Sequence, residues 1–253
     1  MKKINVFLYF YKNKNIKNIV DMLNKTSSKN VNIFFDIYDQ DNENKVNQYI
    51  NLKNVRYNHI FWDKMFGISY YRNRSLDNEF DYFLEIKNIN FIKENWDKEL
   101  IDIHEDNILY SGKNKIDMNF LFTDKKNSLF LKDLYNLKYY GQDILLLYLT
   151  YKNKLNIKNI NDSFVSFNTD TILSSDYIPY SLYHNYNKTI SLIKSDLEFV
   201  SYCNSNNIDL SSYKLKGGQI DDLNYFEFKY NIDYKESEKF KNTIKTLKIE
   251  KVE

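Results

Sequence analysis

Four short apolar runs in the first 90 residues are each followed by polar residues that could bind a ligand. In an open α/β sheet, ligands bind beyond the carboxyl ends of the strands, near the point where the strand order reverses. Asp and Asn also end strands and cap helices, so their shared position carries more weight than any single residue. The candidates are Tyr11 and the stretches 36–41, 59–63 and 85–88.

The apolar runs alternate with amphipathic stretches, and this pattern is typical of consecutive βα units. We expect strands at 3–11, 31–38, 54–60 and 81–87, with helices beginning near residue 16 and covering 65–77. Ile16, Ile19, Val20 and Leu23 recur at helical spacing. The first 90 residues therefore predict half of a doubly wound, mainly parallel α/β sheet.

Later segments extend this domain. Asn95 is a candidate cap for a helix that reaches about His104, and a buried helix is expected after Gly141. Further strands are expected at 107–111, 117–123, 155–160 and 163–168. After residue 174 the pattern changes to Tyr-rich segments, a helix at 189–204 and a charged, helix-like end. We expect one α/β domain over 1–170 and a small C-terminal lobe over 171–253.

Four stretches, in this order and at this spacing, resemble a family of N-acetylglucosaminyltransferases that attach the sugar to hydroxyl groups of cytoplasmic proteins. The stretches are 66–72, which ends Gly-x-x-x-x-Arg, the apolar strand 80–87, Asn-Trp-Asp-Lys-Glu-Leu-Ile at 95–101, and Gly-Gln-Asp at 141–143. The resemblance covers about residues 3–160, and the Asn-Trp-Asp stretch is its most specific part. It implies a GT-A fold, which is Rossmann-like, with residues 1–170 binding the nucleotide sugar and 171–253 lying on the acceptor side.

The resemblance also implies a UDP-sugar donor whose pyrophosphate is held by Mn²⁺ or Mg²⁺ at the end of the fourth strand. This chain departs from that plan. Where the family has Asp-Ser-His, the aligned residues are Lys87, Asn88 and Ile89.

Two interpretations of this departure are open. The Lys87 ammonium could replace the metal charge on the diphosphate, which would make the enzyme independent of metal. Alternatively, Glu85, on the same strand face as Lys87, could hold a weak metal together with His184. We favour the first, with Lys87 as an essential residue.

The resemblance assigns roles to other residues. Arg72 would pair with phosphate or with an acidic neighbour. Asp143 matches an acid of the family and would orient or deprotonate the acceptor hydroxyl, although it could equally stabilise a helix N-terminus. Tyr11 and Asp39 would contact the base and the ribose, and Asn88 would lie beside the diphosphate.

Composition limits the rest. The 36 basic and 34 acidic residues leave a formal charge of +2, so the chain as a whole does not attract nucleic acid. No segment approaches the roughly 18 apolar residues that cross a bilayer. A single cysteine, Cys203, excludes an internal disulfide and favours a cytoplasmic location.

The leading hypothesis is transfer of a hexose or N-acetylhexosamine from a nucleotide diphosphate sugar, with UDP favoured, to a hydroxyl on a protein, a glycan or a hydroxymethylated DNA base. No membrane partner is expected. A catalytically inactive protein that keeps the fold is one alternative. Nucleic-acid binding through the Lys- and Tyr-rich C-terminal region is another.

Overall fold

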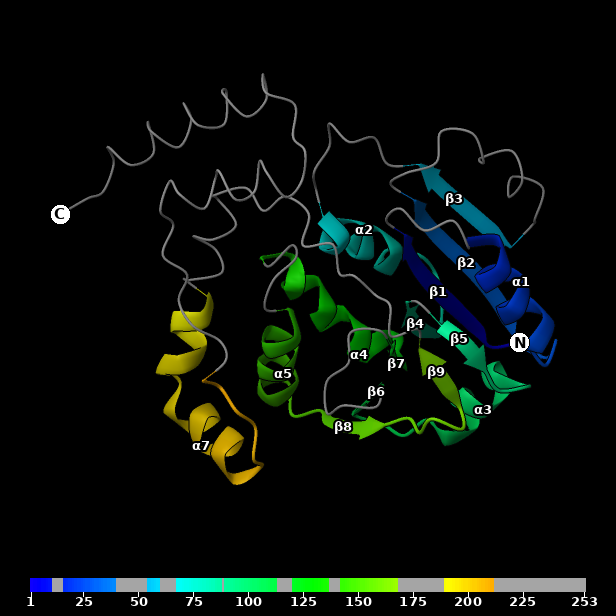
Figure 1. The fold of residues 1–253 in the computed structure, drawn as a ribbon. Helices are drawn as coiled ribbons and strands as arrows, with labels where there is room; N and C mark the ends of the chain where they lie inside the picture. The colour runs from blue at the N-terminus through cyan, green and yellow to red at the C-terminus, as the bar shows by residue number, and fades with distance from the viewer. Residues whose placement is uncertain are drawn as a thin grey trace, which may run out of the picture. The chain divides into compact units, whose positions relative to one another are not determined.

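A computed structural model describes residues 1–10, 16–39, 54–59, 67–87, 89–112, 120–136, 142–167 and 189–211. The chain divides into two compact units, residues 1–171 and 172–253 (Figure 1).

The first unit begins with the parallel half of a sheet. Its elements are β1 (Lys3–Phe10), α1 (Ile16–Thr26), β2 (Asn32–Asp39), β3 (Val55–His59), α2 (Gly67–Leu76) and β4 (Tyr82–Ile86). The strands lie in the order β3-β2-β1-β4, and every adjacent pair is parallel. All four expected strands and both expected helices are present, with ends within about two residues of those predicted.

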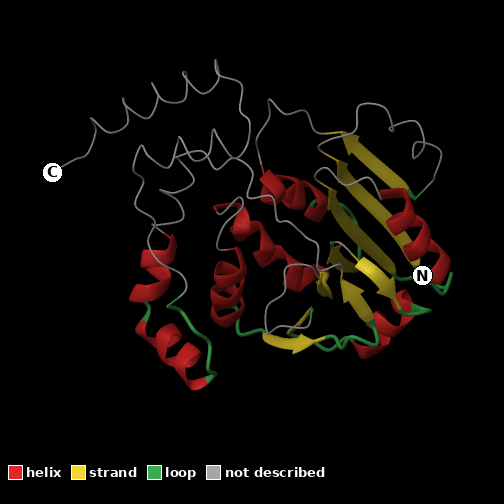
Figure 2. Ribbon diagram, viewed as in Figure 1, coloured by secondary structure: helices red, strands yellow, loops and turns green. Residues whose placement is uncertain are grey.

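The second half of the sheet is mixed. After β4 come β5 (Ile89–Ile92), α3 (Trp96–Ile103), β6 (Ile108–Ser111), β7 (Phe120–Asp124), α4 (Lys125–Ser128), the 3₁₀ segment η2 (Leu129–Asn136), α5 (Gln142–Lys152), β8 (Asn156–Asn159) and β9 (Val165–Phe167). β7 runs antiparallel between β4 and β6, and β8 pairs with β6 in parallel. A seven-stranded sheet results, beside a small β5-β9 sheet (Figure 2). The sequence had not predicted β5, α4 or η2.

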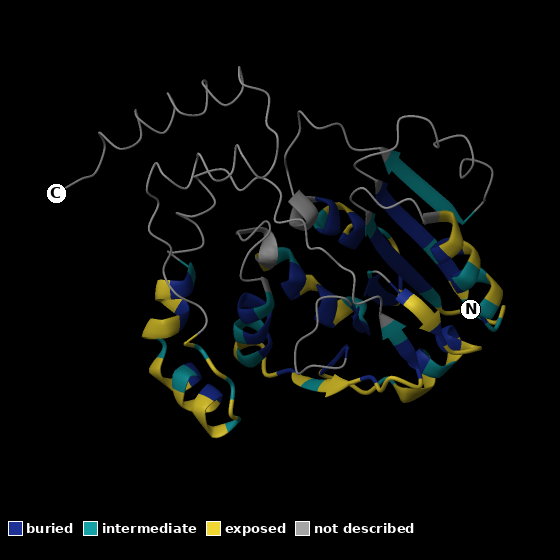
Figure 3. Cartoon of the chain, viewed as in Figure 1, coloured by how far each residue is buried: buried dark blue, intermediate teal, exposed yellow. Residues whose placement is uncertain are grey.

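The two faces of the sheet are covered by different helices. Alternate side chains of the parallel strands, Ile4, Val6 and Leu8 in β1 for example, join the main hydrophobic core with residues of α1 and α3. The opposite side chains, such as Asn5, face α2, where the Asn5 amide donates to the Ser75 hydroxyl over 2.9 Å. The central strands are therefore buried on both faces, whereas the outer strand β3 is only half-buried (Figure 3).

The Asn-Trp-Asp stretch anchors α3 against α1. Trp96 is fully buried, and its indole N–H donates to the Leu23 carbonyl oxygen over 3.0 Å. The buried Asp97 carboxylate accepts from the Ser28 backbone N–H and hydroxyl, each over 2.7 Å. Asn95 has a left-handed φ of 58° and makes no side-chain cap, so its predicted capping role was wrong. The Asn-Trp-Asp stretch therefore has a packing role in this chain.

We predict that Asp97→Ala lowers the free energy of unfolding by about 1.5–3 kcal/mol, because two hydrogen bonds to a buried, charged acceptor are lost. Asn95→Gly is the matched control and should be neutral or slightly stabilising, since Gly adopts positive φ without strain. Urea unfolding measures both. If Asn95→Gly lowered the free energy of unfolding more than Asp97→Ala does, Asn95 and not Asp97 would stabilise the start of α3.

In the second unit, residues 189–195 and α7 (Leu197–Ser205) are helical. The single helix expected at 189–204 is interrupted at Asp196, whose carboxylate accepts from the Phe199 backbone N–H and caps α7. Burial raises the pKa of the Cys203 thiol, so this cysteine has the properties of a packing residue. Within the described ranges, no helix is both long and apolar enough to span a bilayer.

Candidate functional site

The carboxyl ends of β1, β2 and β4 bring polar and aromatic side chains together on the face that α2 covers. Tyr9 of β1 lies opposite Tyr38 of β2, and Phe7 lies opposite Glu85 of β4. Continuing the β1-β4 register by two residues places Lys87 in the row of Tyr9. The described strand-end residues among those selected from the sequence, 36–39 and 85–87, therefore belong to one edge of the sheet.

Three tyrosines form a cluster at this edge. The Tyr71 ring, from α2, lies 5.0 Å from the Tyr38 ring and stacks on Tyr9 with centroids 6.3 Å apart. Tyr38 is almost fully buried, and this burial, with Asp36 nearby, raises the pKa of its hydroxyl. The hydroxyl therefore stays protonated and can both donate and accept hydrogen bonds. Sequence reasoning missed this cluster, although a tyrosine near the carboxyl end of each of two neighbouring strands was a usable signal.

Next to the tyrosines lies an ion network of Arg72, Glu85 and Lys87. Arg72 Nε is 2.5 Å from one Glu85 oxygen, and Arg72 Nη2 is 3.0 Å from the other. Lys87 Nζ is 2.9 Å from Glu85 Oε1. Arg72 and Glu85 side chains are fully buried, whereas the Lys87 side chain keeps 13% exposure. Two cations and one anion leave this network with one positive charge.

The charge state of Glu85 follows from its partners. Burial alone would raise the pKa of Glu85, but Arg72 and Lys87 together lower it, to about 2. Glu85 is therefore ionised at neutral pH. Of the two roles considered for Arg72, the pairing with an acidic neighbour is the one that this structure contains.

The described residues at this edge do not fit a divalent cation. Both oxygens of Glu85 already accept from cationic side chains, and the positive charges of Arg72 and Lys87 beside this carboxylate would repel a divalent cation. Asn88 and His184, the other residues considered for the diphosphate and the metal, lie outside the described residues.

Other candidates are placed as follows. Asp39 ends β2 and pairs in register with Phe10, but its side chain is not described, and Tyr11 lies outside the described residues. Asp36 is buried and accepts from Arg56 and Asn78, so it holds the edge strand β3 and the α2-β4 turn in place.

Asp143 lies in the first turn of α5 and is half-buried. At this position the Asp143 carboxylate can stabilise the N-terminus of α5. Its use as a base stays a prediction.

No known protein family matches the chain by sequence, and no curated protein does so. Solved structures do match. The crystal structure of S. aureus TarS 1-349 in complex with UDP-GlcNAc has a TM-score of 0.53 at 17% identity, over 79% of this chain and 69% of that one. The crystal structure of the same protein in complex with UDP has a TM-score of 0.51 at 17% identity, over 89% of this chain and 78% of that one. The crystal structure of a mycobacterial protein has a TM-score of 0.50 at 11% identity, over 76% of this chain and 74% of that one.

The chain has a GT-A-like fold. At these identities the likeness establishes the fold alone, and neither an activity nor a substrate. Membership in the family that modifies cytoplasmic proteins stays a prediction. Within a GT-A-like sheet, the tyrosine cluster and the ion network occupy the edge at which open α/β sheets bind ligands.

Proposed function

We propose that this protein is a glycosyltransferase that moves a hexose or N-acetylhexosamine from a UDP-sugar to a hydroxyl group. The observation that carries the proposal is the positively charged Arg72–Glu85–Lys87 network beside three clustered tyrosines, at the ligand-binding edge of a GT-A-like sheet. The network supplies charge for a diphosphate, and Tyr9, the partly exposed member of the tyrosine cluster, supplies aromatic surface for a nucleobase. The UDP and UDP-GlcNAc complexes of TarS support the choice of donor.

In the proposed complex, the nucleoside lies at the ends of β1 and β2. Tyr11 and Asp39 contact the base and the ribose, and the tyrosine cluster borders them. The diphosphate reaches across to Lys87 and Asn88 at the end of β4. This order follows the sheet, in which β1 lies between β2 and β4.

Within the network, we assign phosphate binding to Lys87. It is the least buried of the three, and its ammonium has three donors, so it can contact a phosphate oxygen while keeping Glu85. Glu85 is a positioning residue that orients Lys87, and Arg72 holds Glu85 in place. Because the donor set here does not suit a cation, we propose that transfer needs no metal, and the Glu85 and His184 metal site is the competing proposal.

In the transfer step one bond forms and one bond breaks. The acceptor hydroxyl oxygen attacks the anomeric carbon, the bond from that carbon to the phosphate oxygen breaks, and the electron pair leaves with the diphosphate. The acceptor proton must go to a base, and we assign this role to Asp143. Lys87 stabilises the negative charge that grows on the leaving phosphate.

The acceptor is a hydroxyl of a protein, a glycan or a hydroxymethylated base, and residues 171–253 are proposed to form the acceptor side. A protein acceptor follows from the sequence resemblance alone. An inactive protein that binds the donor without transferring sugar is the competing function. Hydrolysis assays over UDP-, GDP- and TDP-sugars, with and without chelator, separate transfer from binding alone.

We predict that UDP or a UDP-sugar at about 100 times its dissociation constant stabilises the protein by roughly 3 kcal/mol. For a chain of this size the melting temperature should rise by roughly 5–10 °C. A thermal unfolding series with UDP, GDP and TDP measures the shift and its base preference. If no nucleotide at millimolar concentration changes the melting temperature, the donor site is wrongly assigned.

A further inference from the structure

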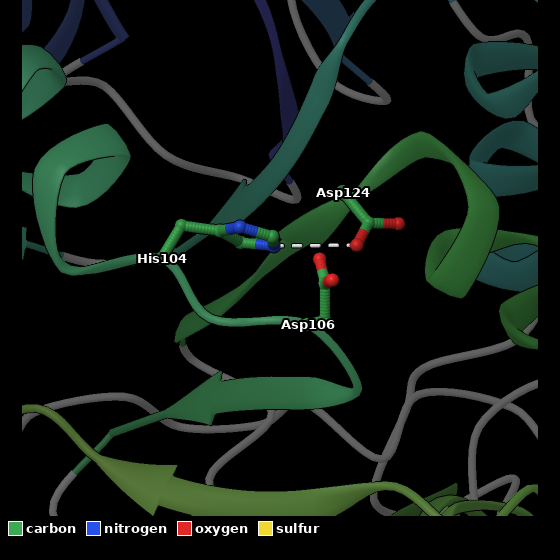
Figure 4. Close-up of side chains that lie close together, drawn as sticks. All are labelled: His104, Asp106 and Asp124. Carbon is green, nitrogen blue, oxygen red and sulfur yellow. Dashed lines mark ion pairs between the residues drawn. The ribbon is translucent and has the colours of Figure 1, made fainter.

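A second cluster of ligand-type side chains lies at the opposite end of β4. His104 follows α3, Asp106 precedes β6, and Asp124 ends β7 (Figure 4). Asp124 pairs in register with Tyr82, the first residue of β4, whereas Glu85 and Lys87 lie at that strand's other end. This cluster is therefore separate from the proposed donor site.

The three side chains converge on one point. Each offers one ligand atom, and these atoms lie within 4.8 Å of one another. The Asp124 oxygens also accept from the backbone N–H and side-chain amide of Asn127, over 2.7 and 2.8 Å, which fixes the carboxylate. Each carboxylate oxygen has two lone pairs, so Asp124 can bind a further partner.

His104 supplies an independent indication of a ligand. Its side chain is nine-tenths buried, and Nε2 lies 3.3 Å from Asp124 Oδ2 without forming a hydrogen bond. The ring packs edge-on against Tyr82 and Phe122, with centroids 5.1 and 6.2 Å away, so its direction is fixed. A buried nitrogen without a hydrogen bond costs about 1–3 kcal/mol unless a ligand satisfies it. Figure 4 shows this nitrogen directed at the two carboxylates.

We propose that His104, Asp106 and Asp124 bind a divalent transition-metal ion of the zinc class. One imidazole nitrogen and two carboxylate oxygens are ligands that Zn²⁺, Co²⁺ and Mn²⁺ accept, and two carboxylates with a neutral imidazole balance a charge of two. Water completes the coordination. The ion joins the end of α3 to the adjoining ends of β6 and β7, so its role is to stabilise this part of the sheet.

The test is calorimetric titration of ZnCl₂ into the full chain after removal of metal with EDTA, with no nucleotide sugar present. His104→Phe keeps the aromatic contacts and removes the ligand nitrogen, and Asp106→Asn changes an exposed carboxylate without disturbing the core. Asp102→Asn is the matched control, because Asp102 is also exposed and lies two residues from His104 outside the cluster. Circular dichroism checks that each variant is folded.

We expect one Zn²⁺ per chain, a higher melting temperature with Zn²⁺, and binding at least about tenfold weaker in both ligand variants but unchanged in Asp102→Asn. Co²⁺ should give visible absorption that both ligand variants lose. The proposal is overturned if the wild type binds no Zn²⁺ or if the ligand variants bind it equally well. His104 and Asp124 would then form only an ion pair. The titration contains no nucleotide sugar, so its outcome does not depend on whether the proposed donor site is correct.

Discussion

Lys87→Ala should lower kcat/KM for sugar transfer by about 30- to 1000-fold, which corresponds to a loss of about 2–4 kcal/mol of transition-state stabilisation. The physical reason is that Lys87 is the partly exposed cation of the network, next to the proposed diphosphate site. The variant lacks the ammonium group that would stabilise the negative charge as it develops on the leaving phosphate. Steady-state kinetics with a UDP-sugar, with and without EDTA, measures the effect.

The matched control is Lys93→Ala. Lys93 is a half-exposed lysine that pairs with Glu99 of α3 and does not belong to the Arg72–Glu85–Lys87 network, so its removal should leave transfer unchanged. Lys87→Asp is the sharper variant, because it adds a negative charge beside the diphosphate. Metal-free turnover that survives Lys87→Asp would reject Lys87 as the substitute for a cation. Wild-type activity that is lost in chelator and restored by Mn²⁺ would instead favour the Glu85 and His184 site.

Periodicity predicted most of the first unit because the central parallel strands β1, β2 and β4 are buried on both faces and read as short apolar runs. Residues 3–10, 32–39 and 82–86 follow this pattern, with polar residues directly after them. The same-face placement of Glu85 and Lys87 also follows from the alternation of a strand, and their 2.9 Å contact agrees with it. Short elements such as β5 and α4, which are four residues each, give too little periodic signal to be found this way.

Contacts between distant segments were harder to predict. The sequence shows Tyr9, Tyr38 and Tyr71 as three residues in three elements, and only the β1-β2 register and the direction of α2 bring their rings together. The helix start at residues 95–97 was correctly located, but its physical cause was not. The anchor is the contact of Asp97 with Ser28, 69 residues earlier, which no local capping rule describes.

The Arg72–Glu85 pair should have the largest effect on stability. Arg72→Met leaves the fully buried Glu85 carboxylate with Lys87 alone, and breaking a buried pair in this way lowers the free energy of unfolding by about 3–5 kcal/mol. The double variant Arg72→Met/Glu85→Leu removes both buried charges and should recover most of that loss, because a hydrophobic pair of similar volume is often as stable as the ion pair. Urea unfolding of the two single variants and the double variant gives the coupling energy.

The dependence of the free energy of unfolding on pH tests whether Arg72 acts through its charge on Glu85. Because the folded-state pKa of Glu85 is lowered from 4.5 to about 2, its ionised form stabilises the wild type fully above pH 4.5, and this contribution is lost as the pH falls towards 2. In Arg72→Met the burial of Glu85 is opposed by only one cation, so its pKa should rise and the gap in stability to the wild type should narrow as the pH falls below 4.5. A gap that stays constant over this range, together with additive effects in the double variant, would show that Arg72 stabilises the protein through packing of its alkyl chain and not through Glu85.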